Sequence, residues 1–129
     1  MAGTIAADTL THSTAGSLAT NFIVNGSAKA WVNLDGTGTI AARDSFNTSS
    51  FTDNGTSDYT TSFSSSMSND DYAVPAQSTA NGNSYTIDAP KQAAAANITT
   101  SSIRSLGTDY NGNINDHHFV HISILGDLA

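Results

Sequence analysis

The sequence predicts an all-β fold, an antiparallel β-sandwich or jelly roll that follows an extended N-terminal arm. Three observations support this class. Asn-Gly and Asp-Gly pairs recur along the chain, and such pairs accept the positive φ angles of tight hairpin turns. Short segments with strand-like alternation lie between these turns. Glu is absent, and Lys and Arg together number only four, so residues that sustain long helices are scarce.

Residues 1–21 are predicted to form the extended arm, and residues 22–129 the β-domain. Ile5, Leu10 and Leu18 are scattered among Thr, Ser, Ala and Gly in the first segment. Their density is too low for a core strand, so the segment is expected to lie outside the core. Spaced apolar residues in such a segment favour a role in attachment to a larger assembly.

Eight short segments of the β-domain have strand character, and an up-and-down barrel is the alternative arrangement to a sandwich. Val120, Ile122 and Ile124 fall on one side of the last segment, as in a half-buried strand. The apolar pattern changes phase between Phe46 and Phe51 and again within 98–103. These changes predict bulges, or strands that turn a corner between sheets. The predicted strands span residues 22–24, 28–34, 39–46, 59–63, 72–76, 84–87, 98–105 and 118–125, with a loop at 90–97.

The segment RDSFNTSSFTDNGTSDYTTSF, residues 43–63, predicts a surface β-hairpin. Its turn is expected at Asp53-Asn54-Gly55, where Asn54 and Gly55 are the structural turn residues, because they tolerate positive φ. The same segment offers neither a nucleophile beside a base nor a basic surface. Composition and spacing therefore indicate its fold but no function.

Candidate surface-recognition residues are Tyr59 and the loop from Asn81 to Asn83. Aromatic rings stack on the apolar faces of sugars, and Asn side chains bind hydroxyl groups. Against this interpretation, aromatic residues of strands more often belong to the core or to cross-strand pairs. The aromatic residues considered for such a platform are Trp31, Tyr59, Tyr72, Tyr85 and Tyr110.

Charge and composition exclude several classes of partner. The net charge is -7 and the pI is near 4.5, so the protein repels nucleic-acid backbones and anionic lipid. No apolar run reaches the length of a membrane span, and residues 1–16 lack the basic start and apolar centre of a signal peptide. Without Cys there is no disulfide, thiol nucleophile or thiolate-bound metal. We expect no nucleic acid, no membrane insertion and no cofactor.

Two groups of residues invite a metal-binding hypothesis. Asp109, Asn111 and Asn113 alternate as oxygen ligands do in a calcium loop, but the glycine is misplaced and the final acidic ligand is missing. A polar hairpin loop explains this segment better.

The second group, His117, His118 and His121, has ligands suited to zinc or iron. In a strand, however, His117 and His121 would face one side and His118 the other. Hydrogen-bonded histidines explain this segment better, with a site on an oligomer axis as the alternative.

The sequence predicts that the protein is not an enzyme. It contains no nucleophile elbow of the Gly-x-Ser-x-Gly type, and no Ser stands at a defensible spacing from a His. Glycosidase chemistry requires two carboxylates across a cleft, whereas the Asp pairs of this chain fall in turns.

A family resemblance adds what composition and spacing do not. The stretch AKAWVNLDGTGTIAARDSFNTSSFTDNGTSDYTTSF and the closing FVHISILGD resemble a family of tailed-bacteriophage virion structural proteins, often labelled tail-fibre proteins. The resemblance covers residues 25–74 well and the last ten residues fairly. Leu34 and Thr61 depart from the family pattern. The residues that carry the resemblance are Trp31, Asn33, Gly36, Gly38, Arg43, Asp53, Asn54, Gly55 and Tyr59.

The resemblance implies a non-enzymatic structural protein on the virion surface, made in the host cytoplasm. It further implies a homotrimer that contacts phage capsid or tail proteins. Family labels favour a tail fibre, whereas a chain of 129 residues beginning at Met1 favours a head decoration protein or head fibre. The alternative function is a carbohydrate-binding receptor-recognition module that contacts host surface glycans during adsorption.

Overall fold

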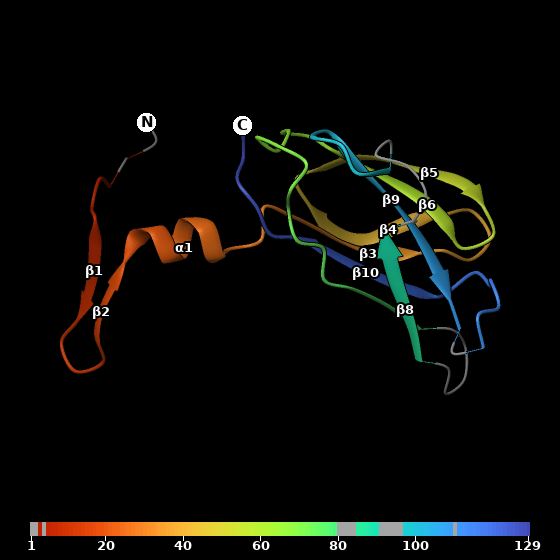
Figure 1. Ribbon diagram of the computed structural model, residues 1–129, viewed down its shortest axis with the longest axis horizontal. Helices are drawn as coiled ribbons and strands as arrows, with labels where there is room; N and C mark the ends of the chain where they lie inside the picture. Colours follow the sequence, from red (N-terminus) through yellow and green to blue (C-terminus); the bar gives the residue numbers. More distant parts are fainter. Residues whose placement is uncertain (1–2, 4, 80–84, 91–96, 110) are drawn as a thin grey trace.

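Eight antiparallel strands form one continuous sheet that folds over on itself as a β-sandwich, and a separate hairpin and helix project from it (Figure 1). The computed structural model describes residues 3, 5–79, 85–90, 97–109 and 111–129. The order of strands in the sheet is β4-β3-β10-β7-β8-β9-β6-β5. The all-β class predicted from the turn signals is confirmed. The elements are β1 (Thr9–His12), β2 (Gly16–Ala19), α1 (Thr20–Gly26), β3 (Ala30–Asp35), β4 (Ala41–Phe46), β5 (Thr48–Gly55), β6 (Asp58–Phe63), β7 (Ala76–Thr79), β8 (Tyr85–Pro90), β9 (Ser102–Thr108) and β10 (Phe119–Ile124).

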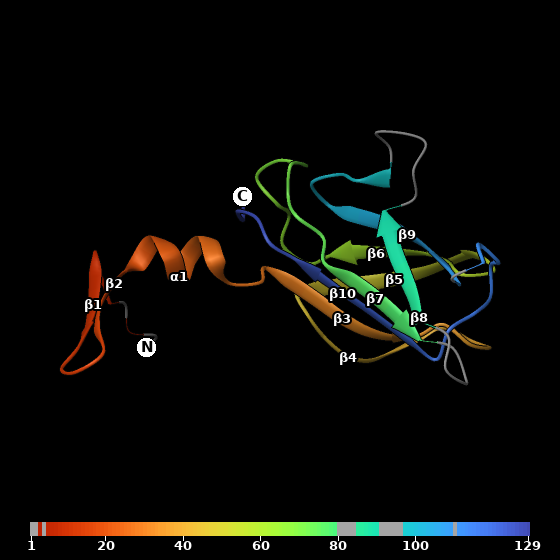
Figure 2. The same ribbon diagram turned by 60° about the horizontal axis from the view of Figure 1, so that its bottom comes forward.

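The core lies between two layers that β8 connects. One layer contains β4, β3, β10 and β7, and the other contains β9, β6 and β5 (Figure 2). Alternate residues of β3 and β10 are buried, as the period of two in a strand requires. The buried apolar residues are Ala30, Val32, Leu34, Tyr59, Phe63, Met67, Tyr72, Ile103, Val120, Ile122 and Ile124.

The chain passes from one layer to the other at Asn47. This residue joins β4 to β5, which stand at opposite ends of the strand order. Its φ of 54° is left-handed, a region that Asn tolerates better than most residues. The Asn47 amide donates to the Lys29 carbonyl oxygen at 2.9 Å and accepts from the Ser65 N–H at 2.7 Å. The change of phase between Phe46 and Phe51, which predicted a bulge or a corner, thus coincides with this corner and with a register shift between Thr48 and Ser50.

Two predicted strands are wrong. Residues 22–24 lie in the helix α1, because a short apolar run without clear periodicity does not distinguish a helix from a strand. Of the predicted strand at 72–76, residues 72–75 contribute only an isolated bridge from Ala73 to Leu125, and Ala76 is the first residue of β7. The side chains of β7 that face the core are small, so apolar content did not reveal it. The turn at 81–83 and most of the loop at 90–97 lie outside the described residues.

The β5-β6 hairpin turns two residues later than predicted. Gly55 pairs with Asp58, so Thr56 and Ser57 form the turn, and a bulge between Asp53 and Gly55 leaves Asn54 unpaired in the ladder. Gly55 has a φ of 134°, which agrees with the positive φ expected of it. Asn54 supports the hairpin through a hydrogen bond from its amide to the Thr60 hydroxyl at 2.9 Å.

Replacing Gly55 with Val should destabilise this hairpin. A β-branched residue is strained at a φ of 134°, and such strain costs about 1–3 kcal/mol. Thermal unfolding followed by circular dichroism measures the effect. Thr56→Val is the matched control, because it adds the same side chain at the next, exposed position. Equal melting temperatures for the two variants would contradict this account of the turn.

Candidate functional site

The N-terminal segment, residues 5–26, is the candidate site for interaction with a partner. Its hairpin β1-β2 and the helix α1 project from one end of the sandwich, the end at which the C-terminus also lies (Figure 1). None of the residues of α1 is buried. Phe22 is 65% exposed and Ile5 is 90% exposed, values that are unusual for large apolar side chains. The large apolar residues exposed on this segment are Ile5, Leu10, Leu18, Phe22, Ile23 and Val24.

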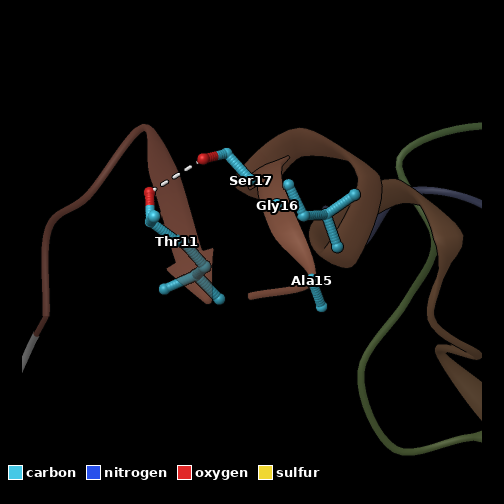
Figure 3. Close-up of a pocket in the computed structure, with 6 residues that line it drawn as sticks. Thr11, Ala15, Gly16 and Ser17 are labelled. Atoms are coloured by element: carbon cyan, nitrogen blue, oxygen red, sulfur yellow. Dashed lines mark hydrogen bonds between the residues drawn. The ribbon is translucent and has the colours of Figure 1, made fainter. Parts of the chain in front are cut away.

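All of these apolar residues except Phe22 line one or both of two open pockets in the described part of the segment. The larger, of about 570 Å³, lies between the chain before β1 and the helix, and Ile5, Leu10, Ile23 and Val24 line it. The smaller, of about 420 Å³, lies within the hairpin beside Leu18. Figure 3 shows the smaller pocket, where the hydroxyls of Thr11 and Ser17 are hydrogen bonded at 3.0 Å. Both pockets are formed entirely by the N-terminal segment.

Lys29 connects this segment to the sandwich by hydrogen bonds. Its ammonium group donates to the carbonyl oxygens of Val24 and, at 2.8 Å, Ser27. A cation near the last carbonyl groups of a helix satisfies them and opposes the helix dipole. The backbone of Lys29 donates to the Ile124 carbonyl oxygen of β10 at 2.8 Å. One residue thus caps α1 and joins the edge of the core.

The structure contradicts the prediction that Tyr59 is a surface-recognition residue. Tyr59 is 1% exposed, and its hydroxyl is 3.0 Å from both the Gly36 carbonyl oxygen and Asp116 Oδ1. Tyr59, Thr61 and Phe63 share one face of β6, as the alternation predicts, and all three are buried. This face of β6 is therefore the core side. Asn81 and Asn83 lie outside the described residues.

The other described aromatic residues considered for a sugar platform do not form one shared surface. Tyr72 is buried and donates to the Thr99 carbonyl oxygen at 3.0 Å, and burial raises its pKa to about 12. The aromatic residue of this group that keeps an outward position is Trp31, half-buried on β3. Tyr110 and the side chain of Tyr85 lie outside the described part of the chain.

The three histidines do not converge. His117 is buried, and its Nδ1 is 2.8 Å from the Ser78 hydroxyl. His118 lies beside Asp35, with 3.8 Å between its Nδ1 and Asp35 Oδ1, and His121 lies on the exposed face of β10. The prediction that His117 and His121 share a face is wrong, because β10 begins only at Phe119 and the alternation does not extend back to His117.

Asp109 organises its loop by hydrogen bonds. Its Oδ1 accepts from the backbone N–H groups of Asn111 and Asn113, both at 2.8 Å, and its Oδ2 accepts from the Asn113 amide at 2.9 Å. These bonds hold the pKa of Asp109 below its usual value. Within the described residues, no cluster of three His or Asp side chains is placed to hold a metal ion.

A buried polar cluster at the other end of the sandwich was not found by sequence reasoning. It consists of the buried residues Gly36, Tyr59, Ser78 and His117, with the exposed residue Asp116 at its edge. The Gly36 N–H donates to the His117 carbonyl oxygen at 2.9 Å, in addition to the contacts of Tyr59 and Ser78 given above. The Ser78 and His117 side chains meet as a nucleophile and a base would, but both are 0% exposed. The two residues are 39 positions apart in the chain, so no local spacing indicated the pair.

Comparison with protein-family models, curated proteins and solved structures finds no match to this chain. No helix in the described ranges is long and apolar enough to cross a membrane.

Proposed function

We propose that this protein is a non-enzymatic structural component of the surface of a tailed-phage virion, and that it docks through its N-terminal segment. It would act as a head decoration protein, a head fibre or a tail-fibre-like protein, assembled as a homotrimer after synthesis in the host cytoplasm. The family resemblance of residues 25–74 and the closing strand supports the class. The observation that carries the docking role is the exposure of six large apolar side chains on a projecting segment.

The N-terminal segment has little to stabilise it within one chain. Its hairpin has four residues in each strand, and isolated two-stranded hairpins are marginally stable in water. The helix has seven residues and no side-chain hydrogen bond at its N-cap, and helices this short are unstable without tertiary packing. Burial of a large apolar side chain contributes about 1.5–3 kcal/mol. A partner that covered this segment would therefore supply the missing stabilisation.

Charge favours the same segment as the attachment point. Only one of the eleven acidic residues, Asp8, lies between residues 5 and 26. The remaining ten belong to the sandwich, which opposes close approach of another acidic surface. A nearly neutral segment meets a protein partner without that repulsion, so three copies would associate through it with the least electrostatic cost.

Polar substitutions on the helix test the docking role. Phe22→Ser with Val24→Ser removes two exposed apolar side chains, at 65% and 58% exposure, without touching the core. We expect the variant to retain the β-domain, as judged by circular dichroism and thermal unfolding. It should no longer bind phage particles that were assembled without this protein, measured by co-sedimentation. Ile114→Ser is the control, because Ile114 is an exposed apolar residue outside the N-terminal segment.

Three results would contradict the proposal. Full decoration of particles by the double variant would show that the N-terminal segment is not the attachment point. A monomer in analytical ultracentrifugation at micromolar concentrations would contradict the trimer. Turnover of polysaccharide or ester substrates that is lost on mutation of a single Asp or Ser would contradict a non-enzymatic role.

A further inference from the structure

The outer face of the layer formed by β4, β3, β10 and β7 carries a row of hydrogen-bonding side chains. Asp44, Asn33, His121 and Gln77 are consecutive cross-strand partners, so their side chains lie next to one another on the face turned away from the core. We call these four residues the polar row. Figure 2 shows β3, β10 and β7 side by side in this layer.

Aromatic side chains flank the polar row on both sides. Phe46 and Trp31 are cross-strand partners on one side, and Phe46 is 54% exposed. Phe119 lies on the other side and is 42% exposed. Trp31 pairs with Ser123, four residues along β10 from Phe119, so the aromatic groups are about 13 Å apart along the strands.

Contacts within the face hold the ring of Phe119 in place. The Arg43 guanidinium lies over it, with Cζ 4.5 Å from the ring centroid, and the His121 ring stacks beside it at 6.1 Å. Arg43 in turn donates to Asp35 Oδ2 at 2.6 Å and to the His118 carbonyl oxygen at 2.8 Å. A bulge in the pairing of β3 with β4 directs Arg43 to this face. The ring of Phe119 is thus held in position before any ligand binds.

We infer that this face is a binding platform for a neutral oligosaccharide. A sugar ring presents C–H groups above and below and hydroxyl groups around its edge. Phe46 and Trp31 supply apolar surface for the C–H groups, and the part of Phe119 that Arg43 and His121 leave exposed adds to it. The amides and carboxylate of the polar row supply partners for the hydroxyls. The separation of the aromatic groups suits a short chain of sugars. This inference does not depend on the proposed virion role.

Charge and an unused acceptor narrow the class of ligand. The net charge of -7 and the carboxylates of Asp44 and Asp35 oppose an anionic sugar. At the centre of the polar row, Asn33 Oδ1 has no hydrogen-bond donor among the described residues and is covered by its neighbours. A rotation of the amide would present this oxygen to a ligand hydroxyl. A buried polar atom without a partner is costly, so this contact would favour binding.

A protein partner fits this face less well. The centres of protein interfaces are depleted of charged side chains. Here hydrogen-bonding side chains occupy the centre, the Asp44 carboxylate lies on the edge strand β4, and the aromatic side chains lie on either side of the polar row. A flat protein surface would have to cover Asp44 and the Arg43–Asp35 pair, whereas a sugar bonds with such groups and leaves them hydrated.

Saturation-transfer NMR with the purified full chain tests the inference. The probes are cellohexaose, maltohexaose and chitohexaose, with polygalacturonate as the anionic comparison. We expect saturable binding of at least one neutral probe with a Kd on the order of 1 mM or tighter. Phe46→Ala and Phe119→Ala should each weaken it by about tenfold, because each removes exposed aromatic surface that the sugar would contact. Ile114→Ala, an exposed position outside the face, should bind as the original chain does.

Each other outcome would overturn the inference. These outcomes are no saturable binding of any neutral probe up to about 10 mM, binding unaffected by both Phe variants, and tighter binding of polygalacturonate. Self-association lost in Phe46→Ala and Phe119→Ala would instead assign the face to contacts between copies of the chain. Thermal unfolding of every variant shows that a loss of binding is not a loss of fold. The sugar-binding results do not depend on the co-sedimentation experiment with phage particles, so a failure of docking there would not alter them.

Discussion

Replacing Gly36 with Ala is expected to lower the free energy of unfolding by about 3 kcal/mol. A Cβ atom at this position would lie 2.3 Å from the Tyr59 hydroxyl oxygen and 2.9 Å from the His117 carbonyl oxygen. Neither neighbour has room to move, because Tyr59 and His117 are both buried. Separation of these groups would also break the hydrogen bond from the Gly36 N–H to His117. Urea unfolding followed by fluorescence measures the change.

Gly26→Ala is the matched control for this substitution. A Cβ atom at Gly26 meets no atom within 4 Å, so its effect should be small. Tyr59→Phe provides a second check, because it removes the hydroxyl that Gly36→Ala displaces. The loss of unfolding free energy in the double variant should be smaller than the sum of the losses in the two single variants, as expected of residues in contact. Strict additivity, or an unchanged stability of Gly36→Ala, would contradict the contact.

Acidification should destabilise the protein through His117 before its carboxyl groups titrate. Burial lowers the pKa of His117 below its usual 6.5, although the Asp116 and Asp109 carboxylates act in the opposite direction. Protonation is costly because His117 Nδ1 is already hydrogen bonded to the Ser78 hydroxyl, and the buried Nε2 has no hydrogen-bond partner among the described residues. An imidazolium would therefore place an unpaired donor in the core.

The direction of the pH dependence follows from proton uptake. With its pKa lowered in the folded state, His117 binds a proton more readily in the unfolded chain. The contribution of neutral His117 to the free energy of unfolding is fully present above pH 6.5, and it is lost as the pH falls toward the folded-state pKa. Hydrogen bonds from Thr37 and Asn113 lower the pKa of Asp35 and Asp109 respectively, below 3.8. Their contributions are lost only in more acidic solution.

Melting temperatures between pH 7 and pH 4.5 test this prediction. We expect the original chain to lose stability over this window and His117→Gln to lose much less, because Gln does not titrate. His121→Gln, at an exposed position of β10, should retain the dependence of the original chain. An identical pH profile for His117→Gln and the original chain would show that the buried imidazole is not responsible.

Local patterns in the sequence determined the all-β class, an irregularity between Phe46 and Phe51 that was either a bulge or a corner, and the positive φ of Gly55. Each depends on residues close together in the chain, on turn chemistry or on the period of two in a strand. The helix α1 and the strand β7 were not predicted from these patterns. Their segments are short, and Phe22–Val24 or a small-residue strand carries no distinctive period.

The tertiary structure alone decided which face of each strand is covered and which distant residues meet. Alternation placed Tyr59 on one side of β6 but did not reveal that this side is the core. The Ser78–His117 pair and the outer-face contact of Arg43 with Phe119 join residues 39 and 76 positions apart. Such contacts depend on the register and order of β3, β4, β7 and β10. Pairing between distant strands is selected by the packing of the whole sheet, which no short stretch of sequence encodes.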